Sequence, residues 1–441
     1  MASFKSYNIN NNGDKKIIGK LITSLKNLID IESKEYNIYN AVREENNKRI
    51  SKNSPYVGIK NIGSLCYINS IMQQFYWISK FKSSILSAND NKPPDKSFNL
   101  TDDDNILHQT QRLFTFLSFS SFGEFIPQNF IFSIKIFGER INHNQMLDSS
   151  EFYLHFLDSI KTLLENTEYK NLIEDLFCGK LQVKKICSEC SNTSFREEEF
   201  KSISLEVKDI KDIYQSLDNY ISEEIIDDYN CDKCNKKVKL KKSLMISSLP
   251  NILVIHLKKM IYNNKGELEK INSKYDFPLE LNIKNYSKEN NKVNEDYYKY
   301  NLRGINIHKG TATGGHYISL IQTSKENNKW YLFDDSSVKE YDFNLYEEEF
   351  NKKDKSDSAY ILFYESVQEK PMKTIFKENI PKQYLLEILD DNKTYENIYG
   401  NKVIDVNNEL IKIFMDIIDN KSFKLKDKKV TYYEIKDLID I

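Results

Sequence analysis

Cys66 and His316 are the residues whose types and surroundings are best suited to covalent chemistry. Cys66 stands in GIKNIGSLCYINS (58–70), where apolar residues begin to recur at helical spacing, so we expect a helix to begin near it. The first turn of a helix has unpaired N–H groups and the positive end of the helix dipole, which stabilise a thiolate and an oxyanion. Cys66 is therefore a candidate nucleophile. Its position is equally consistent with a small buried apolar side chain.

A nucleophilic cysteine needs a base and a group that orients the base. His316 follows two glycines, Gly314 and Gly315, which allow a substrate backbone to approach closely, and it opens a predicted strand. Asp334 and Asp335 end the next predicted strand, from which a carboxylate can reach the imidazole. The pattern therefore predicts a triad of Cys66, His316 and Asp334. His256, which alternates with apolar residues, is interpreted as a structural strand histidine instead.

Two CxxC pairs form a second group with possible chemistry. They comprise Cys187 with Cys190 and Cys231 with Cys234, and 40 residues separate the pairs. Four thiolates around Zn²⁺ make a closed tetrahedral site, which is structural because no ligand position remains open. We expect the zinc to join two distant β-turns at the tip of an elongated sheet. The alternative is a degenerate site that holds no metal.

The composition bounds the fold and the partners of the chain. Its 441 residues are 40% hydrophobic and 29% charged, which predicts two or three folded units with a sizeable core. A net charge of −2 gives no basic field for nucleic acid, and no apolar run approaches the ~20 residues that span a bilayer. We therefore expect a monomer in the cytoplasm, the nucleus or both, without nucleic-acid or membrane partners.

Periodicity predicts a helical lobe, then a β-rich lobe, then a helical tail. Helices are expected over 17–31, from about 66 to 78, and over 148–164, 384–391 and 408–419. Short β-branched segments predict strands over 200–207, 243–249, 251–259, 301–309, 316–323, 330–335 and 359–366.

Several of these segments resemble one protein family. GIKNIGSLCYINSIMQQ resembles the cysteine box of ubiquitin-specific proteases. INIHKGTATGGHYISLI, KWYLFDDSSV and AYILFYE resemble their histidine box, about 250 residues further on. The resemblance covers about residues 55–366, and NSIMQQFYWI with the helical tail is most similar to the large fat-facets-like members.

The resemblance implies an α+β fold, a papain-like cysteine protease with a helical thumb, a β-sheet palm and zinc-tipped β fingers. The thumb would span about 55–177, the fingers 178–258 and the palm 259–366. Residues 1–54 would then be an N-terminal helical extension, and 367–441 a C-terminal helical tail.

The resemblance also implies a role for each matching residue. Cys66 would be the nucleophile, His316 the general base and then acid, and Asp334 the orienting carboxylate. Asn61 would donate to the oxyanion, with Asp335 assisting. The family has Asn-Thr before the cysteine where this chain has Ser64-Leu65, which changes the loop but removes no reacting group.

The implied substrate is ubiquitin on ubiquitinated proteins, whose basic tail ends in Gly-Gly. The segment MLDSSEFYLHFLD (146–158) resembles the family's acidic tail-binding segment, with Asp148 and Glu151 at its acidic positions. Asp148 is also a good helix N-cap, and both roles can hold together. A catalytically impaired ubiquitin-binding scaffold is the alternative to a deubiquitinase. A zinc-bearing nucleic-acid module is less consistent with the sequence, because it leaves the Cys66 and His316 segments unexplained.

Overall fold

The computed structural model describes residues 54–90, 105–136, 138–142, 144–288, 294–324, 328–352, 356–376, 380–399, 423–425 and 428–430. The chain divides after Ile50, and all described residues belong to the second unit, Ser51–Ile441. The helices expected over 17–31 and 408–419 lie outside the described residues. No helix in the described ranges is long and apolar enough to cross a membrane.

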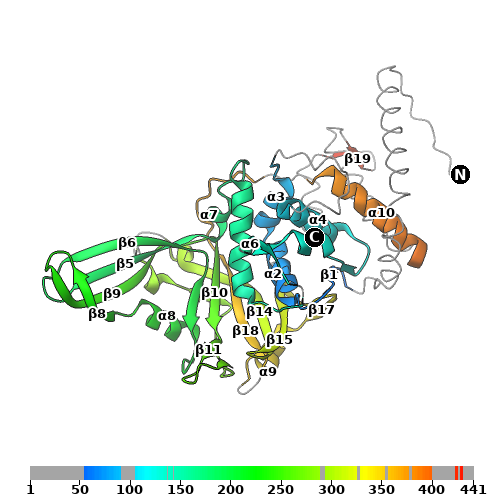
Figure 1. The fold of residues 1–441 in the computed structure, drawn as a ribbon. Helices are drawn as coiled ribbons and strands as arrows, with labels where there is room; N and C mark the ends of the chain where they lie inside the picture. Colours follow the sequence, from blue (N-terminus) through cyan, green and yellow to red (C-terminus); the bar gives the residue numbers. More distant parts are fainter. Residues whose placement is uncertain are drawn as a thin grey trace. The chain divides into compact units, whose positions relative to one another are not determined.

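The described part of this unit before Gly179 is mainly helical (Figure 1). The central one begins at Cys66, as predicted, and nearly all of its side chains are buried. The Phe75 ring lies 4.9 Å from the Phe81 ring and 5.5 Å from the Tyr153 ring, so aromatic packing joins three helices. The helices are α2 (Cys66–Trp77), α3 (Ser79–Ser87), α4 (Ile106–Phe119), α5 (Gln128–Ser133), α6 (Ser149–Leu164) and α7 (Leu172–Phe177).

Two pairs of short strands lie among the helices. The first pair is parallel and consists of β1 (Gly58–Ile59) and β2 (Glu124–Phe125). It joins the segment before Cys66 to the segment after α4. The second pair is an antiparallel hairpin of β3 (Lys135–Ile136) and β4 (Glu139–Arg140).

A mixed sheet packs against α2 and forms the palm. Its strand order is β17-β16-β15-β14-β18-β10-β7, with β13 also pairing with β14. The central strands are almost fully buried, because helices cover one face and other segments cover the second. The strands are β7 (Ile203–Glu206), β10 (Ile252–Lys258), β13 (Glu280–Asn282), β14 (Lys299–Thr311), β15 (Gly314–Ser324), β16 (Lys329–Asp334), β17 (Ser337–Tyr341) and β18 (Ser358–Ser366).

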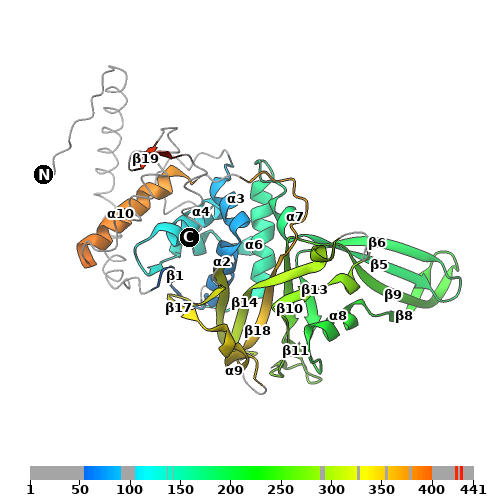
Figure 2. The same cartoon turned by 180° about the vertical axis from the view of Figure 1, so that it is seen from behind.

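A second, four-stranded sheet extends away from the helices (Figures 1 and 2). Its order is β6-β5-β9-β8, and all neighbouring strands are antiparallel. The strands are β5 (Gly179–Cys187), β6 (Thr193–Phe200), β8 (Glu224–Cys231) and β9 (Lys236–Ser248). The helix α8 (Ile213–Ile221) packs against β7 and β9. We call this sheet the fingers.

The strand expected over 200–207 is divided between the two sheets. β6 ends at Phe200 in the fingers, and β7 begins at Ile203 in the palm. The period-2 pattern shifts by one residue at the break, from Phe200 to Ile203 and Leu205, and this shift is the signal that the expected single strand overlooked. The segment expected over 243–249 is the end of the longer strand β9. The range 178–258 therefore contributes strands to both sheets.

The tail following β18 returns to the thumb. The helix α10 (Lys382–Tyr399) packs against α4, with Leu385 and Ile388 fully buried. Arg112 Nε lies 2.8 Å from both carboxylate oxygens of Glu387. The remaining described elements are α9 (Tyr346–Phe350), the hairpins β11 (Met260–Tyr262) with β12 (Leu268–Lys270) and β19 (Phe423–Leu425) with β20 (Lys428–Val430), and the 3-10 helices η1 (Lys284–Tyr286), η2 (Glu295–Tyr298) and η3 (Phe343–Leu345).

Candidate active site and cysteine cluster

Cys66 is the first residue of α2 and is buried, with 3% of its surface exposed. The preceding Leu65 offers no side-chain cap, so the helix start keeps its positive field at the thiol. The loop before it is closed by Asn61, whose Oδ1 accepts the N–H groups of Gly63 at 3.1 Å and Leu65 at 3.2 Å. Asn61 thus fixes the approach of the chain to Cys66.

His316 and Asp334 come from adjacent strands, β15 and β16, and His316 Nε2 lies 2.6 Å from Asp334 Oδ1. An ionised carboxylate can only accept, so Nε2 donates and Nδ1 is the basic nitrogen. Hydrogen bonds to Asp334 and to Cys66 raise the pKa of His316 to about 10, although burial opposes them. The bond from His316 in turn lowers the pKa of Asp334. The structure therefore brings the three predicted triad side chains together.

Asp335 links the palm to the thumb beside this triad. Its Oδ2 accepts from Asn61 Nδ2 at 3.0 Å and its Oδ1 from Asn69 Nδ2 at 2.8 Å. Its backbone oxygen accepts the Ile59 N–H at 2.9 Å. Burial raises the pKa of the Asp335 carboxyl, while the two amide donors oppose that shift. One N–H of the Asn61 amide is therefore directed at Asp335, which leaves the second for an oxyanion.

Sequence reasoning missed Asn69. This residue is 3% exposed, and its Nδ2 also donates to the Ile59 carbonyl at 3.2 Å. It follows Cys66 by three residues, so the two side chains share one face of α2. A polar residue at this spacing on an apolar helix is the signal that identifies it.

The glycine hairpin, residues 309–316, joins β14 to β15 and leads into His316. A Cβ at Gly315 would lie 2.2 Å from the Lys309 carbonyl oxygen and 2.4 Å from His308 Nε2, so packing alone requires glycine there. At Gly314, nothing lies within 4 Å of a Cβ position, and the residue is exposed. Gly314 therefore has the open surroundings expected of a substrate-facing glycine, whereas Gly315 packs closely against Lys309 and His308.

Asp148 is the N-cap of α6. Its Oδ1 accepts the backbone N–H and the hydroxyl of Ser150, each at 2.7 Å. The Tyr360 hydroxyl donates to its Oδ2. All these donors are neutral, so none of them forms an ion pair with Asp148. Glu151 lies in the first turn of the same helix and is exposed.

His256, interpreted as a structural histidine, lies in the palm strand β10. Its Nδ1 is 3.2 Å from the Ser204 hydroxyl oxygen, and its ring packs edge-on to Tyr360 at 5.0 Å. Burial lowers its pKa, so the imidazole is neutral. These contacts are those of a packed strand residue.

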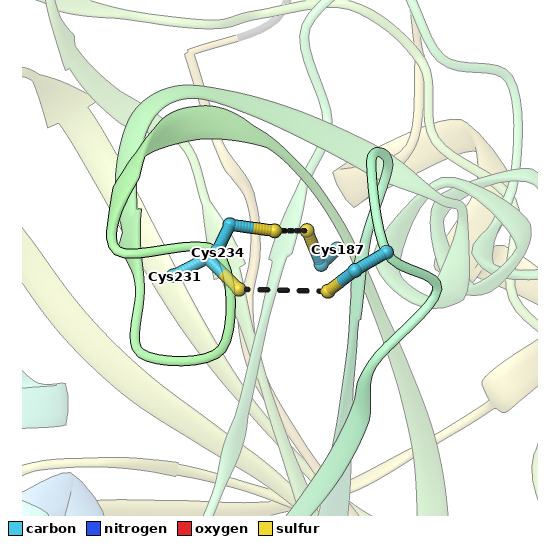
Figure 3. Close-up of side chains that lie close together, drawn as sticks. Cys187, Cys231 and Cys234 are labelled. Carbon is cyan, nitrogen blue, oxygen red and sulfur yellow. Dashed lines mark hydrogen bonds between the residues drawn. The ribbon is translucent and has the colours of Figure 1, made fainter.

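The four cysteines of the CxxC pairs meet at the end of the fingers (Figure 3). Cys187 ends β5 and Cys231 ends β8, and each is followed by a tight turn that carries the second cysteine of its pair. Both turns close alike, since Ser191 N–H donates to Cys187 O at 3.0 Å and Asn235 N–H to Cys231 O at 2.8 Å. The predicted meeting of two distant turns is therefore observed.

The sulfur geometry fits a tetrahedral metal. Cys187 Sγ lies 3.8 Å from Cys234 Sγ, and Cys190 Sγ lies 3.8 Å from Cys231 Sγ, without a disulfide. A zinc–sulfur bond of about 2.3 Å gives a tetrahedral sulfur–sulfur edge of about 3.8 Å. The backbone N–H groups of Cys190 and Glu189 lower the pKa of Cys187 to about 6. The pKa of Cys234 is raised to about 12, mainly by its hydrogen bond with Cys190. Four thiolates at this distance would repel one another unless a cation lay between them.

The basic run KKVKLKK (236–242) lies on β9 as an exposed strand face. Four of its five lysines pair with acidic groups, mainly on or next to the neighbouring strand β8. The ion pairs are Lys236–Glu189 at 3.3 Å, Lys239–Asp227 at 3.5 Å, Lys241–Glu223 at 2.8 Å and Lys242–Glu224 at 3.6 Å. The run is therefore locally neutralised.

A helical thumb and a β palm that meet at a thiol and a histidine–aspartate pair, with a separate finger sheet, define a papain-like cysteine hydrolase. The family model described as "Ubiquitin carboxyl-terminal hydrolase" matches residues 57–364 of the chain. The chain therefore belongs to the ubiquitin carboxyl-terminal hydrolase family. This confirms the resemblance to ubiquitin-specific proteases and the α+β fold that it implied.

The chain is also similar to individual members of that family. It is 28% identical over 396 residues to human "Ubiquitin carboxyl-terminal hydrolase 34". The aligned region covers 78% of this chain and 11% of the relative. It is 27% identical over 401 residues to the Drosophila melanogaster "Probable ubiquitin carboxyl-terminal hydrolase FAF", covering 72% of this chain and 14% of the relative. It is 26% identical over 426 residues to mouse "Ubiquitin carboxyl-terminal hydrolase 9X", and the aligned region covers 76% of this chain and 16% of the relative. The chain thus spans only a small part of these relatives.

Proposed function

We propose that this chain is a thiol-dependent deubiquitinase that hydrolyses isopeptide or peptide bonds after the C-terminal glycine of ubiquitin. The observation that carries the proposal is the 2.6 Å contact between His316 and Asp334, with Cys66 at the start of α2 near enough to the same imidazole to raise its pKa. This arrangement suits a thiolate–imidazolium pair aimed at a carbonyl carbon. Membership of the family supports the choice of ubiquitin.

In the acylation half of the proposed reaction, His316 holds the thiol proton and Cys66 Sγ attacks the glycine carbonyl carbon. A carbon–sulfur bond forms, and the electron pair of the carbonyl moves to oxygen. The Cys66 N–H and the free N–H of Asn61 would stabilise this oxyanion. The carbon–nitrogen bond then breaks, and the leaving amine takes the proton from His316, leaving a thioester.

In the deacylation half, His316 accepts a proton from water as the water oxygen attacks the thioester carbon. The carbon–oxygen bond forms and the carbon–sulfur bond breaks, which releases the ubiquitin carboxyl group and leaves the Cys66 thiolate beside protonated His316. The released carboxyl group gives its remaining proton to solvent and becomes a carboxylate. Asp334 stays ionised throughout, because its pKa is lowered by the bond from His316. It orients the ring and stabilises its charged form.

Asp148 and Glu151 are the proposed partners of the basic ubiquitin tail. Both lie at the start of α6, so their charges are close together. Neutral donors hold Asp148 in place without cancelling its charge. A charge-assisted contact with an arginine would then fix the register of the tail.

We further propose that Cys187, Cys190, Cys231 and Cys234 hold a structural Zn²⁺. The 3.8 Å sulfur separations and the two matching turns support this assignment. The metal would supply cross-linking of the fingers and no step of the reaction.

The function is tested with ubiquitin that carries a thiol-reactive group at its C-terminus, together with a fluorogenic ubiquitin substrate. The wild-type chain should form a covalent adduct and release the fluorophore, and Cys66→Ala should do neither while still binding ubiquitin. Cys178→Ala is the matched control, because Cys178 is a half-buried thiol that contacts Glu199 and should not affect cleavage. Ubiquitin binding by the folded wild-type chain without adduct or turnover would instead establish the scaffold alternative.

A further inference from the structure

Lys270 is a buried lysine that the proposed reaction does not use. It ends β12, and only 7% of its surface is exposed. Its ammonium lies 2.8 Å from His308 Nδ1, 2.8 Å from the His308 carbonyl oxygen and 3.2 Å from the Gly310 carbonyl oxygen, and it also donates to the Ser356 carbonyl. One side chain thus joins three separate segments.

The position of Lys270 explains why an ammonium is needed. The ladder between β14 and β18 ends at the pair His308–Ser358, and Lys270 lies just past that end. Carbonyls that leave a ladder in a buried region must find another donor. Lys270 supplies donors to Gly310 on one side of the opening and to Ser356 on the other.

Burial makes the charged form of Lys270 less favourable than it is in water. Burial lowers its pKa to about 8, with Asp357 favouring the charge and Lys259 opposing it. Burial and the nearby lysine lower the pKa of His308 to about 4, so this imidazole is neutral and its Nδ1 accepts. A side chain that only filled space would not need such a charge.

The anchored carbonyls belong to the strand that supports the glycine hairpin. Lys309 is opposite His316 and Gly310 is opposite Gly315 in the β14–β15 ladder. Gly310 has a φ of 94°, a conformation that favours glycine and that the Lys270 contact holds. His308, the other anchored residue, lies directly behind Gly315. Lys270 therefore contacts the β14 arm of the hairpin, whereas the open Gly314 begins the β15 arm.

We propose that Lys270 is a positioning residue that holds the glycine hairpin in the conformation that receives the two C-terminal glycines of ubiquitin. This inference rests on the proposed function for the identity of the ligand. It predicts that Lys270 matters for binding the tail and much less for the reactivity of Cys66, whose helix does not contact it.

Lys259 provides a matched control. It is buried, with 1% of its surface exposed, and burial lowers its pKa to about 8 as well. Its ammonium donates to the Ser273 carbonyl at 3.1 Å and lies over the Tyr275 ring, away from the hairpin contacts of Lys270. Lys259→Met and Lys270→Met therefore remove equivalent charges with different partners.

The experiment compares the affinities of wild type, Lys270→Met and Lys259→Met for intact ubiquitin and for ubiquitin lacking its last two glycines. The wild type should prefer intact ubiquitin, Lys270→Met should lose about tenfold of that preference, and Lys259→Met should keep it. The rate of Cys66 alkylation by iodoacetamide should stay within about twofold in all three. Lys270→Arg, which keeps the charge but not its compact geometry, should fall in between and is used if Lys270→Met does not fold.

An unchanged preference in Lys270→Met, or an equal loss in Lys259→Met, would overturn the inference. A failure of the proposed function is seen separately, because wild type would then bind ubiquitin without cleaving it. The binding comparison would still decide the role of Lys270.

Discussion

The charge state of His316 is set by its two neighbours. Asp334 accepts from its Nε2, and the nearby Cys66 side chain adds to this effect, so the pKa of His316 is raised to about 10. A histidine in an unfolded chain titrates near 6.5. Stabilisation of the fold by this imidazolium is therefore complete below about pH 6.5 and is lost as the pH rises through about 10.

Asp334→Asn removes the carboxylate that contributes most to the raised pKa of His316. We expect the His316 pKa to fall by about 1–3 units, since a nearby opposite charge shifts a pKa by that amount. Ubiquitin cleavage should fall about 10²- to 10⁴-fold, because the ring loses its orientation and its charge. NMR titration of the histidine side chains measures the shift, and cleavage assays measure the rate.

Asp342→Asn is the control for this change. Asp342 is the cap of η3, and its Oδ1 accepts the Asn344 N–H, a bond that asparagine can also accept. The Asp342→Asn variant should have the same His316 pKa and the same rate of ubiquitin cleavage as the wild type. A wild-type His316 that titrates near 6.5 would show that the ion pair with Asp334 does not form in solution.

Sequence predicted Cys66, His316 and Asp334, with Asn61 and Asp335 beside them, but it did not predict the contacts that hold these side chains or the roles of Asn69 and Lys270. Cys66, His316 and Asp334 stand in local segments whose composition reveals them. Lys270 and His308 are 38 residues apart, and Asp335 and Asn69 are 266 apart. Such contacts depend on how the sheets and helices pack, so no local pattern predicts them.

At the scale of elements, the fingers depend on a cross-link at their tip. The sheet β6-β5-β9-β8 is widely exposed, and at its cysteine end the buried apolar residues are few, Val238 with Cys187 and Cys231. Such a small cluster contributes little hydrophobic stabilisation. A metal that joins the two turns would supply the remaining stabilisation of this end of the fingers.

We therefore expect purified protein to contain one equivalent of zinc by elemental analysis. Cys187→Ser with Cys231→Ser should abolish zinc binding, lower the thermal midpoint and weaken ubiquitin binding. Alkylation of Cys66 should persist, since the thumb does not contain the metal. Cys178→Ser should retain the full equivalent. Protein that is fully stable and free of zinc would contradict the assignment.

The docking of α10 extends the fold past the region matched by the family model. The tail 367–441 is predicted to be helical, but the sequence does not predict that part of it packs back on α4. The amphipathic pattern YLLEILDD gives a helix but does not specify its partner. The structure supplies the partner through buried Leu385 and the Arg112–Glu387 pair.

Leu385 and Leu386 offer an internal comparison. Leu385 is 0% exposed and Leu386 is 50% exposed, although they are neighbours on one helix. Leu385→Ala should lower the free energy of unfolding by about 2–5 kcal/mol, and Leu386→Ala by about 0.5 kcal/mol or less. Urea denaturation measures both. Equal effects would mean that α10 does not dock on the thumb through this face.

At the scale of the whole described unit, the site exists only where thumb and palm are held in register. A buried polar group joins them at Asn306 of β14. Its Nδ2 donates to Ser70 Oγ at 2.8 Å and its Oδ1 accepts from Ser149 Oγ at 2.9 Å. Ser319 of β15 adds a bond to the Ser70 carbonyl at 2.8 Å. Ser70 is one turn past Cys66, and Ser319 is three residues past His316, so these bonds set the distance between nucleophile and base.

Asn306→Leu keeps the approximate volume but leaves the hydroxyls of Ser70 and Ser149 buried without this partner. We expect the free energy of unfolding to fall by about 1–3 kcal/mol, the cost of unsatisfied buried polar groups. The value of kcat for ubiquitin cleavage should fall, because the Asn306 partner Ser70 lies on the helix of Cys66. The affinity for ubiquitin is measured as well, because the second partner, Ser149, is next to Asp148. Asn301→Leu, on the same strand between β13 and β18, should change neither rate nor affinity appreciably. If Asn306→Leu lost stability but kept wild-type kcat, the thumb–palm register would be fixed by apolar packing alone, and the polar group at Asn306 would serve the fold without serving the site.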